Sequence, residues 1–170
     1  MRRSGAILFL ILLAIAAREL KLGESREIAA TNSAQVHVID GDSLKIGTEE
    51  IRIAGIDAPE YRQLCGDGSG GEWACGKAAR DALAALVAAG DLRCTERARD
   101  RYGRALSDCR IRSGDVATAL ARAGFAESAG DARFDPHEQE IAEARAARRG
   151  IWRGPHLHPA DWRRAQRPGP

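Results

Sequence analysis

The sequence predicts an α+β fold in which a small barrel of short strands carries helices. Short β-branched runs separated by turn residues fill the region between Val36 and Ile56. Stretches with the apolar spacing of helices follow later in the chain. Strands that come first, with helices interleaved after them, are typical of one sheet packed against helices in a single domain.

The first strands surround the segment from Val38 to Glu60. Apolar and polar residues alternate on both sides of the turn Asp40-Gly41-Asp42, as in half-buried strands. The last run ends at Pro59, which has no N–H to give to a strand ladder. Each aspartate taken alone is most simply a turn residue. As a group, however, these acids lie at predicted strand ends, where their side chains can leave the core and converge.

Three helices are expected in the rest of the chain. Residues 72–89 carry an apolar face at helical spacing, and residues 115–123 and 136–149 each end before a glycine. Between the first two helices, residues 92–96 and 105–112 are predicted to be short strands around a turn.

The length of 170 residues suggests one domain with extensions. The formal net charge is only +2, so the bulk charge does not indicate a nucleic-acid partner. Binding of a polyanion would have to depend on local clusters of positive charge and on a bound cation.

The first 17 residues are expected to be a targeting segment. Arg2 and Arg3 precede an apolar run, and Ala14-Ile15-Ala16 offers a small-x-small cleavage site. The run is shorter than the roughly 20 residues that cross a bilayer, so we expect a cleaved signal peptide. An uncleaved N-terminal anchor is the alternative, and both place the protein in the periplasm or outside the cell. Residues 18–32 are expected to be a linker.

The chain has four cysteines, an even number that fits an exported protein. Of the three pairings, we expect Cys65–Cys75, which would close a glycine-rich loop, and Cys94–Cys109, which would join two predicted strands. Loops of this size would each contribute ~3 kcal/mol in the chain-entropy account. Four small buried thiols are the alternative.

Two motifs carry a resemblance to a known family. The first is Asp40-Gly41-Asp42 followed by Arg52-Ile53-Ala54-Gly55-Ile56-Asp57-Ala58-Pro59-Glu60, and the second is Asp100-Arg101-Tyr102-Gly103-Arg104. In this order, and with a later Gly150-Ile151-Trp152, they resemble the thermonuclease (staphylococcal nuclease-like) family over about residues 34–153. The resemblance implies an OB-type five-stranded β-barrel with three helices, forming a nuclease domain over residues 33–153.

The resemblance also implies a calcium-dependent nuclease that cleaves DNA and RNA to 3′-phosphorylated products. Asp42, Asp57 and the backbone carbonyl of Ala58 would hold Ca²⁺, which prefers oxygen ligands. Glu60 would activate the attacking water as a general base. Arg52 and Arg104 would stabilise the phosphoryl group in the transition state, because a guanidinium stays charged and can bind two phosphate oxygens.

Arg101 and Tyr102 match family positions near the bound nucleotide, and we expect them to bind substrate. A core or turn role for Tyr102 is the alternative. Nucleic acid is the expected partner, no protein partner is evident, and we expect a monomer. A noncatalytic OB-fold module of the cell envelope, binding nucleic acid or protein, is the alternative function, and a disulfide-stapled structural domain is a third.

Residues 154–170 are expected to be a basic, proline-rich tail. Its composition, with Arg163, Arg164 and Arg167, is typical of a solvated segment, and contact with nucleic acid is the alternative. His156 and His158 have no partner at an identifiable spacing, and metal binding by this pair is a minor alternative.

Overall fold

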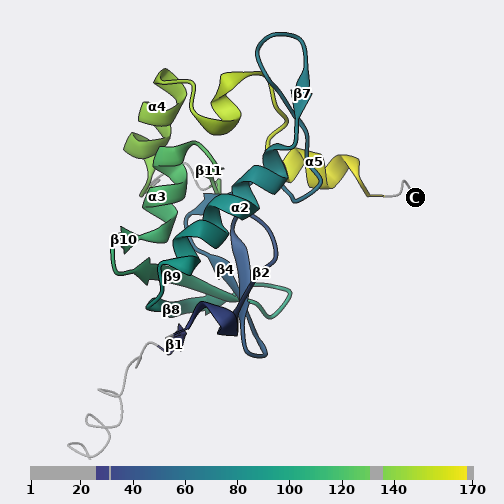
Figure 1. The fold of residues 1–170 in the computed structure, drawn as a ribbon. Helices are drawn as coiled ribbons and strands as arrows, with labels where there is room; N and C mark the ends of the chain where they lie inside the picture. The colour runs from purple at the N-terminus through teal and green to yellow at the C-terminus, as the bar shows by residue number, and fades with distance from the viewer. Residues whose placement is uncertain (1–25, 31, 131–135, 168–170) are drawn as a thin grey trace, which may run out of the picture.

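The structure, a computed structural model, describes residues 26–30, 32–130 and 136–167 (Figure 1). The targeting segment expected at residues 1–17 lies outside the described residues. Within the part of the chain that is described, no helix is long and apolar enough to cross a membrane.

One mixed sheet forms the body of the fold. Its strands are β1 (Glu27–Ala30), β2 (Val36–Val38), β3 (Ser43–Ile46), β4 (Glu49–Ile53), β8 (Leu92–Arg99), β9 (Ala105–Ile111) and β10 (Gly114–Asp115). The order is β1-β8-β9-β4-β3-β2, with β10 paired to β9. Only β4 and β9 run parallel; the other neighbours are antiparallel. The sheet curls into a half-barrel of the OB type, which confirms the predicted α+β class.

The linker expected at residues 18–32 is wrong for Glu27–Ala30. These residues form β1, which pairs with β8 in a register that sets Ile28 opposite Cys94. Ile28 and Ala30 are buried while Glu27 and Ala29 are exposed. This two-residue alternation is the signal of a half-buried edge strand, and it is too short to stand out in a mixed-charge segment.

Among the described residues, four α-helices surround the sheet, one more than expected. They are α2 (Cys75–Ala88), α3 (Val116–Ala123), α4 (Glu138–Ala146) and α5 (Pro159–Ala165). Two short 3-10 helices, η1 (Ser33–Gln35) and η2 (Gly150–Arg153), complete the helical elements of the described residues. In Figure 1, α2 crosses in front of the barrel, and α3 and α4 lie together at its left.

The predicted helices are present with shifted ends. Ala79, Leu83 and Val87 of α2 are buried at four-residue spacing, so this face packs on the sheet. Glu72 and Trp73 do not belong to this helix, because they form β7 (Glu72–Trp73) in a hairpin with β6 (Cys65–Gly66). Helix α4 ends at Ala146 rather than at Arg149. Arg148 has a left-handed φ of 50°, which is incompatible with a right-handed helix.

The hydrophobic core lies between the curled sheet and the helices. Strand β9 alternates buried and less buried residues along its length, so one face of the sheet points inward. The largest fully buried apolar side chains are Leu44, Ile51, Ile53, Ile56, Leu83, Leu92, Leu120, Ile151 and Val116.

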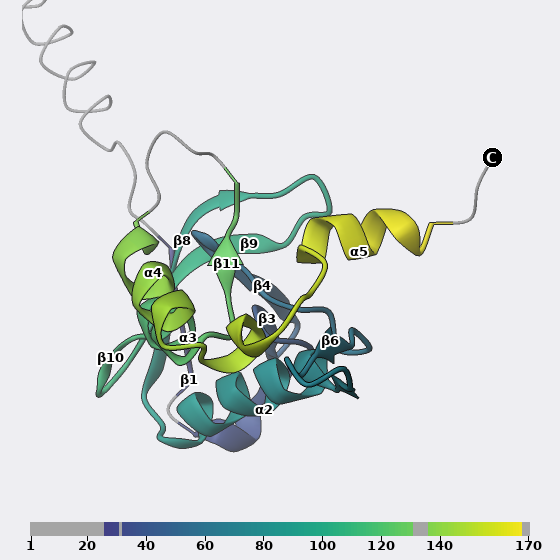
Figure 2. The same cartoon turned by 90° about the horizontal axis from the view of Figure 1, so that it is seen from above.

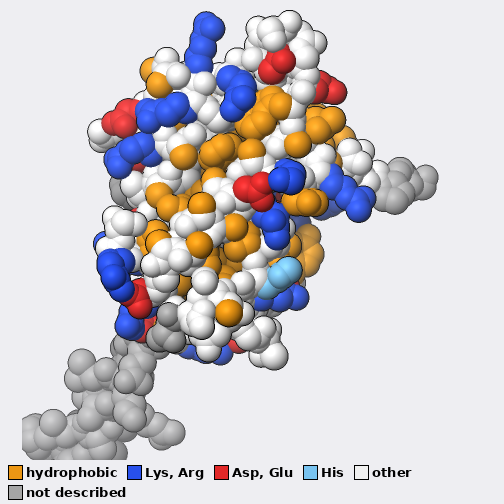
Figure 3. All heavy atoms as spheres, in the orientation of Figure 1, with side chains coloured by type: hydrophobic (Ala, Val, Ile, Leu, Met, Phe, Trp, Pro, Cys, Tyr) orange, Lys and Arg blue, Asp and Glu red, His pale blue; other side chains and the backbone are white. Residues whose placement is uncertain are grey.

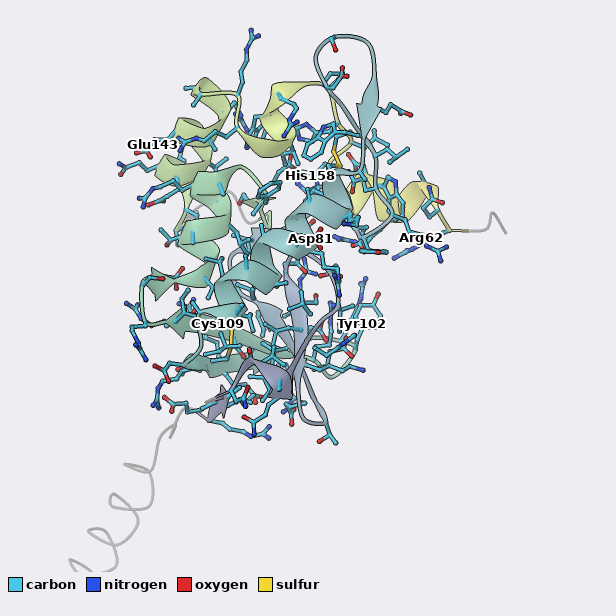
Figure 4. The ribbon with its side chains drawn as sticks, viewed as in Figure 1. Arg62, Asp81, Tyr102, Cys109, Glu143 and His158 are labelled. Carbon is cyan, nitrogen blue, oxygen red and sulfur yellow. A yellow bond between two sulfur atoms is a disulfide. The ribbon has the colours of Figure 1, made fainter. Side chains whose placement is uncertain are left out.

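Both expected disulfides are present. Cys65 and Cys75 join the β6–β7 hairpin to the start of α2, with their Cα atoms 5.6 Å apart. Cys94 and Cys109 face each other across β8 and β9, with a Cα separation of 4.1 Å. Figure 4 shows this second bond at Cys109, within the sheet.

The solvated tail expected at residues 154–170 is wrong for much of its length. Pro159 is buried at the start of α5, and the His158 side chain caps this helix by accepting from the N–H of Ala160 at 3.2 Å. The carbonyl of Pro155 accepts from the N–H of Gly66 at 2.7 Å. A proline is favourable in the first turn of a helix, so proline content alone did not make this segment irregular. Figure 2 shows α5 leaving the body of the fold, with its C-terminal end pointing away from it.

Candidate active site

Two buried aspartates lie on either side of an arginine where the strands end. Asp42 directly precedes β3, and Asp57 ends β5 (Ile56–Asp57), a short strand paired with β11 (Glu127–Ser128). Arg52 of β4 is placed opposite Ser43 by the strand register. Its Nη1 donates to Asp42 Oδ1 at 3.0 Å, and its Nη2 donates to Asp57 Oδ1 at 2.6 Å. The two carboxylates therefore converge on one guanidinium.

The side chain of Asp42 is 2% exposed, and two hydrogen bonds hold it in place besides the contact with Arg52. Its Oδ1 accepts from the hydroxyl of Ser43 at 2.8 Å, and its Oδ2 accepts from the N–H of Ala58 at 3.0 Å. Burial raises the pKa of Asp42 to about 7, although the charge of Arg52 opposes this shift. Burial and the nearby carboxylates of Asp40 and Asp57 thus outweigh the one guanidinium beside Asp42, and a bound cation would add positive charge there.

Asp57 is 3% exposed, yet its environment lowers the pKa of its carboxyl group instead of raising it. Burial alone would raise the pKa of Asp57, but hydrogen bonds from Arg163 and the charge of Arg52 outweigh burial and lower it. Arg163 of α5 donates to both oxygens of Asp57, each at 2.9 Å. Asp57 is therefore ionised and already neutralised by arginines.

Glu60 follows Asp57 in a tight turn next to the start of α2. The N–H of Gln63 donates to the carbonyl of Glu60 at 2.7 Å and closes this turn. A Cβ atom on Gly76 would lie 1.7 Å from the same carbonyl oxygen, so only glycine allows α2 to approach the turn this closely. The Glu60 side chain, 25% exposed, accepts from Arg163 Nη1 at 2.7 Å.

Arg104 is held by the turn that joins β8 to β9. Asp100 accepts from the N–H groups of Tyr102 and Arg104 at 2.8 and 3.0 Å, and from Arg104 Nε at 2.7 Å. The guanidinium groups of Arg101 and Arg104 lie 4.9 and 5.6 Å from the centre of the Tyr102 ring. Tyr102 is 66% exposed, which excludes the core role considered for it. Figure 4 shows it at the edge of the sheet on the side of α5.

One cleft of about 680 Å³ brings most of these residues together, but Asp42, Asp57 and Ala58 are buried beside it and do not line it. Arg52, Glu60 and Arg104 all line it, together with Arg101 and Tyr102. The remaining lining residues are Asp40, Glu50, Asp100, Leu106, Arg163 and Arg167. In Figure 3, basic side chains gather over α5 and the adjoining edge of the barrel, whereas the middle of that face, over α2, is largely apolar.

The donor set fits a hard cation. The side chains of Asp42 and Asp57 offer oxygen atoms only, and they already converge on a single positive group, while the backbone N–H of Ala58 donates to Asp42 Oδ2. Among the described residues, no group of three or more His, Cys, Asp or Glu side chains is arranged as a metal site. Two carboxylates and a carbonyl would leave the remaining ligands to water and substrate.

Sequence reasoning missed three side chains that the C-terminal segment brings to this region. Arg163 was assigned to a solvated tail and instead binds Asp57 and Glu60. His156 and His158 have a shared partner after all, because their Nε2 atoms lie 2.6 and 3.0 Å from the carboxylate of Glu127. The sequence did contain one signal for this helix. Proline is favoured in the first turn of a helix, and Pro159, preceded by the capping residue His158, begins α5.

An OB-type barrel whose strand ends carry acids and arginines into one cleft has the architecture of a phosphodiester-cleaving domain. Residues 50–154 match the family described as staphylococcal nuclease homologues. The chain belongs to this family, which confirms the resemblance of the two motifs.

Related proteins agree. The chain is 36% identical over 128 residues to the succinoglycan biosynthesis protein ExoI of Rhizobium meliloti (strain 1021), a match that covers 73% of this chain and 66% of that protein, just under two thirds. It is 33% identical over 123 residues to an uncharacterized endonuclease of Escherichia coli O157:H7, covering 69% and 74%. It is 30% identical over 152 residues to the micrococcal nuclease of Shigella flexneri, covering 78% and 80%. The family match and the two relatives with nuclease names support a nuclease in the broad sense, which implies nucleic acid as the substrate, whereas the name of ExoI carries no such information.

Proposed function

We propose that the protein is an exported, calcium-dependent nuclease that hydrolyses DNA and RNA to 3′-phosphorylated products. The observation that carries the proposal is the convergence of Arg52, Glu60 and Arg104 on one cleft beside two buried aspartates. The two disulfides support an exported location, because disulfides persist in oxidising compartments.

Arg52 and Arg104 would bind the phosphodiester. The negative charge of this group repels a nucleophile, so positive donors are needed on its non-bridging oxygens. Arg104 is anchored through Nε to Asp100, an arrangement that restrains its orientation while its terminal nitrogens remain for substrate. As charge grows on the phosphoryl oxygens in the transition state, these contacts would strengthen.

Glu60 would act as the general base. It lines the cleft with one quarter of its side chain exposed, so a water molecule can reach it. The carboxylate would accept a proton from this water as the oxygen attacks phosphorus and the bond to the 5′ oxygen breaks, leaving the phosphate on the 3′ side. A water nucleophile needs no ribose 2′-hydroxyl, so both DNA and RNA are substrates in this mechanism.

Asp42 and Asp57 would hold calcium, with the carbonyl of Ala58 as a further ligand. Bound calcium would neutralise a phosphate oxygen and orient the group for in-line attack. The convergence of two buried carboxylates on Arg52 supports this role. Arg101 and the exposed ring of Tyr102 would bind the neighbouring nucleotide through charge and stacking.

Incubation of the purified chain with single-stranded DNA and with RNA tests this proposal. We expect cleavage of both with calcium, loss of cleavage on chelation, restoration by added calcium, and 3′-phosphate ends on the products. Magnesium should substitute poorly, because it demands a stricter octahedral geometry. Full activity in metal-free buffer would rule out the calcium site, and binding without cleavage would identify a noncatalytic OB module instead.

A further inference from the structure

Arg163 forms hydrogen bonds with Asp57 and Glu60, the two acids that must be free in the proposed reaction. Its Nη2 donates to Asp57 Oδ2 at 2.9 Å, and its Nη1 is shared between Asp57 Oδ1 at 2.9 Å and Glu60 Oε1 at 2.7 Å. One guanidinium therefore covers both oxygens of a proposed calcium ligand and one oxygen of the proposed base.

The segment that precedes α5 is held against the body of the fold, and this fixes where Arg163 lies. His158 and His156 both contact Glu127, which lies directly opposite Asp57 in the β5–β11 pair. The carbonyl of Leu157 accepts from Gln63 Nε2 at 2.7 Å. Helix α5 thus starts from a fixed point beside the site, and Figure 2 shows its N-terminal end against the barrel. Arg163 lies in the second turn of this helix and is 35% exposed, so it has solvent to move into.

A calcium ion and this guanidinium compete for the same oxygens. Calcium binds carboxylate oxygens at about 2.3–2.6 Å. Both oxygens of Asp57 already accept hydrogen bonds from Arg163, so an ion bound to Asp57 at that distance would repel the charge of this guanidinium. If both the ion and Arg163 were absent, Asp57 would be a buried carboxylate with Arg52 as its closest arginine. In the metal-free protein Arg163 therefore adds positive charge next to this buried carboxylate.

We propose that Arg163 is an intramolecular placeholder for calcium: it neutralises Asp57 and engages Glu60 in the metal-free protein, and calcium must displace it. The inference rests on the proposed function. Its consequence is that α5 sets the calcium affinity of the site. The apparent affinity equals the intrinsic affinity multiplied by the fraction of molecules in which Arg163 has already left Asp57. Release of Arg163 would also free the carboxylate of Glu60 for the attacking water.

Calorimetric titration of calcium in the absence of nucleic acid tests the competition. We expect Arg163→Gln to bind calcium about tenfold or more tightly than the parent, the factor expected if the released state is populated at about a tenth or less. Arg163→Lys, which keeps the charge but loses the two-pronged contact, should fall between them. Arg167→Gln is the matched control. It removes the same charge from the same cleft, at a residue that follows α5 and that, among the described residues, makes no contact with Asp57.

Three outcomes of this titration overturn the placeholder. If Arg163→Gln and Arg167→Gln tighten calcium binding equally, the effect is the general field of the cleft. If Arg163→Gln binds calcium as the parent does, the ion and the arginine do not compete, and the proposed function is left standing. A parent and variants that all fail to bind calcium would overturn the calcium site itself and the placeholder with it. Melting curves on the same samples identify any variant that is unfolded.

A second measurement follows the guanidinium directly. Its nitrogen-bound protons, assigned in NMR spectra by their disappearance in Arg163→Gln, should be protected from exchange without calcium and lose protection at saturating calcium. Retention of full protection with calcium bound would show Arg163 to be a permanent part of the site beside the ion, and would overturn its displacement.

Discussion

Gln63 Nε2 donates a hydrogen bond of 2.7 Å to the carbonyl oxygen of Leu157, 94 residues away in the sequence. Gln63 is fully buried, and its Oε1 accepts from the N–H of Glu60 at 3.3 Å. One amide side chain therefore joins the turn that carries Glu60 to the segment that carries α5. The C-terminal segment is in this way held against the turn of the proposed base.

Replacement of Gln63 with methionine should destabilise the protein. Methionine has a similar length but would leave the Leu157 carbonyl and the Glu60 N–H without this partner, and unsatisfied buried groups cost about 1–3 kcal/mol each. Denaturant unfolding measures the loss. Gln166→Met at the exposed end of α5 is the control and should stay within about 0.5 kcal/mol of the parent. Equal stability of Gln63→Met and the parent would show that the link carries no energy.

The pair His156–Glu127 should make stability depend on pH. The hydrogen bond to Glu127 raises the pKa of His156 above its usual value, although partial burial opposes this. Both ring nitrogens face acceptors, Glu127 Oε1 at 2.6 Å and the Gly154 carbonyl at 3.2 Å, which favours the doubly protonated ring. The stabilisation is therefore complete below the unfolded pKa of about 6.5 and disappears as pH rises through the higher folded pKa.

Unfolding of the parent and of His156→Gln, measured from pH 5 to pH 9, tests this dependence. We expect the difference in unfolding free energy to be largest at low pH and to shrink as pH rises. His37→Gln, at an exposed histidine of β2, controls for loss of a titrating group on the surface. A difference that grew with pH would mean that His156 is bound in its neutral form.

Those features that depend on local pattern were predictable from the sequence. The disulfides follow from a short loop and a strand pair, and α3 follows from Asp115, which accepts from the N–H of Thr118, and from Gly124 with its left-handed φ of 79°. Asp42, Asp57 and Glu60 could be proposed as site residues because their motif is contiguous or nearly so.

The unpredicted features depend on contacts between distant segments. Arg163 lies 106 residues from Asp57, and no periodicity in a basic segment indicates that one of its arginines is bound. The buried position of Arg52 could not be predicted for a similar reason. Its motif indicates a phosphate ligand, but its burial becomes evident only when Asp42 and Asp57 are brought to either side of it.

Arg52 and Arg104 should therefore differ when each is changed to lysine. Both changes keep the charge and lose the planar two-pronged donor, so each should lower turnover by about 10²-fold. Arg52, 15% exposed, also bonds two buried carboxylates, so Arg52→Lys should lower the melting temperature as well. Arg104→Lys should melt close to the parent, because its partner Asp100 is 20% exposed in a turn. An Arg104→Lys variant that is inactive only because it unfolds would remove Arg104 from the mechanism.

Glu60→Gln separates catalysis from structure at the proposed base. The amide keeps the size of the side chain and can still face Arg163 through its oxygen, so the fold and the melting temperature should change little. It cannot take a proton from water, so turnover at saturating calcium should fall by about 10²-fold or more. Calcium affinity, measured on the same sample, should move far less than turnover, because Glu60 is not a ligand in this mechanism. A folded Glu60→Gln that cleaved DNA near the parent rate would mean that another group activates the water.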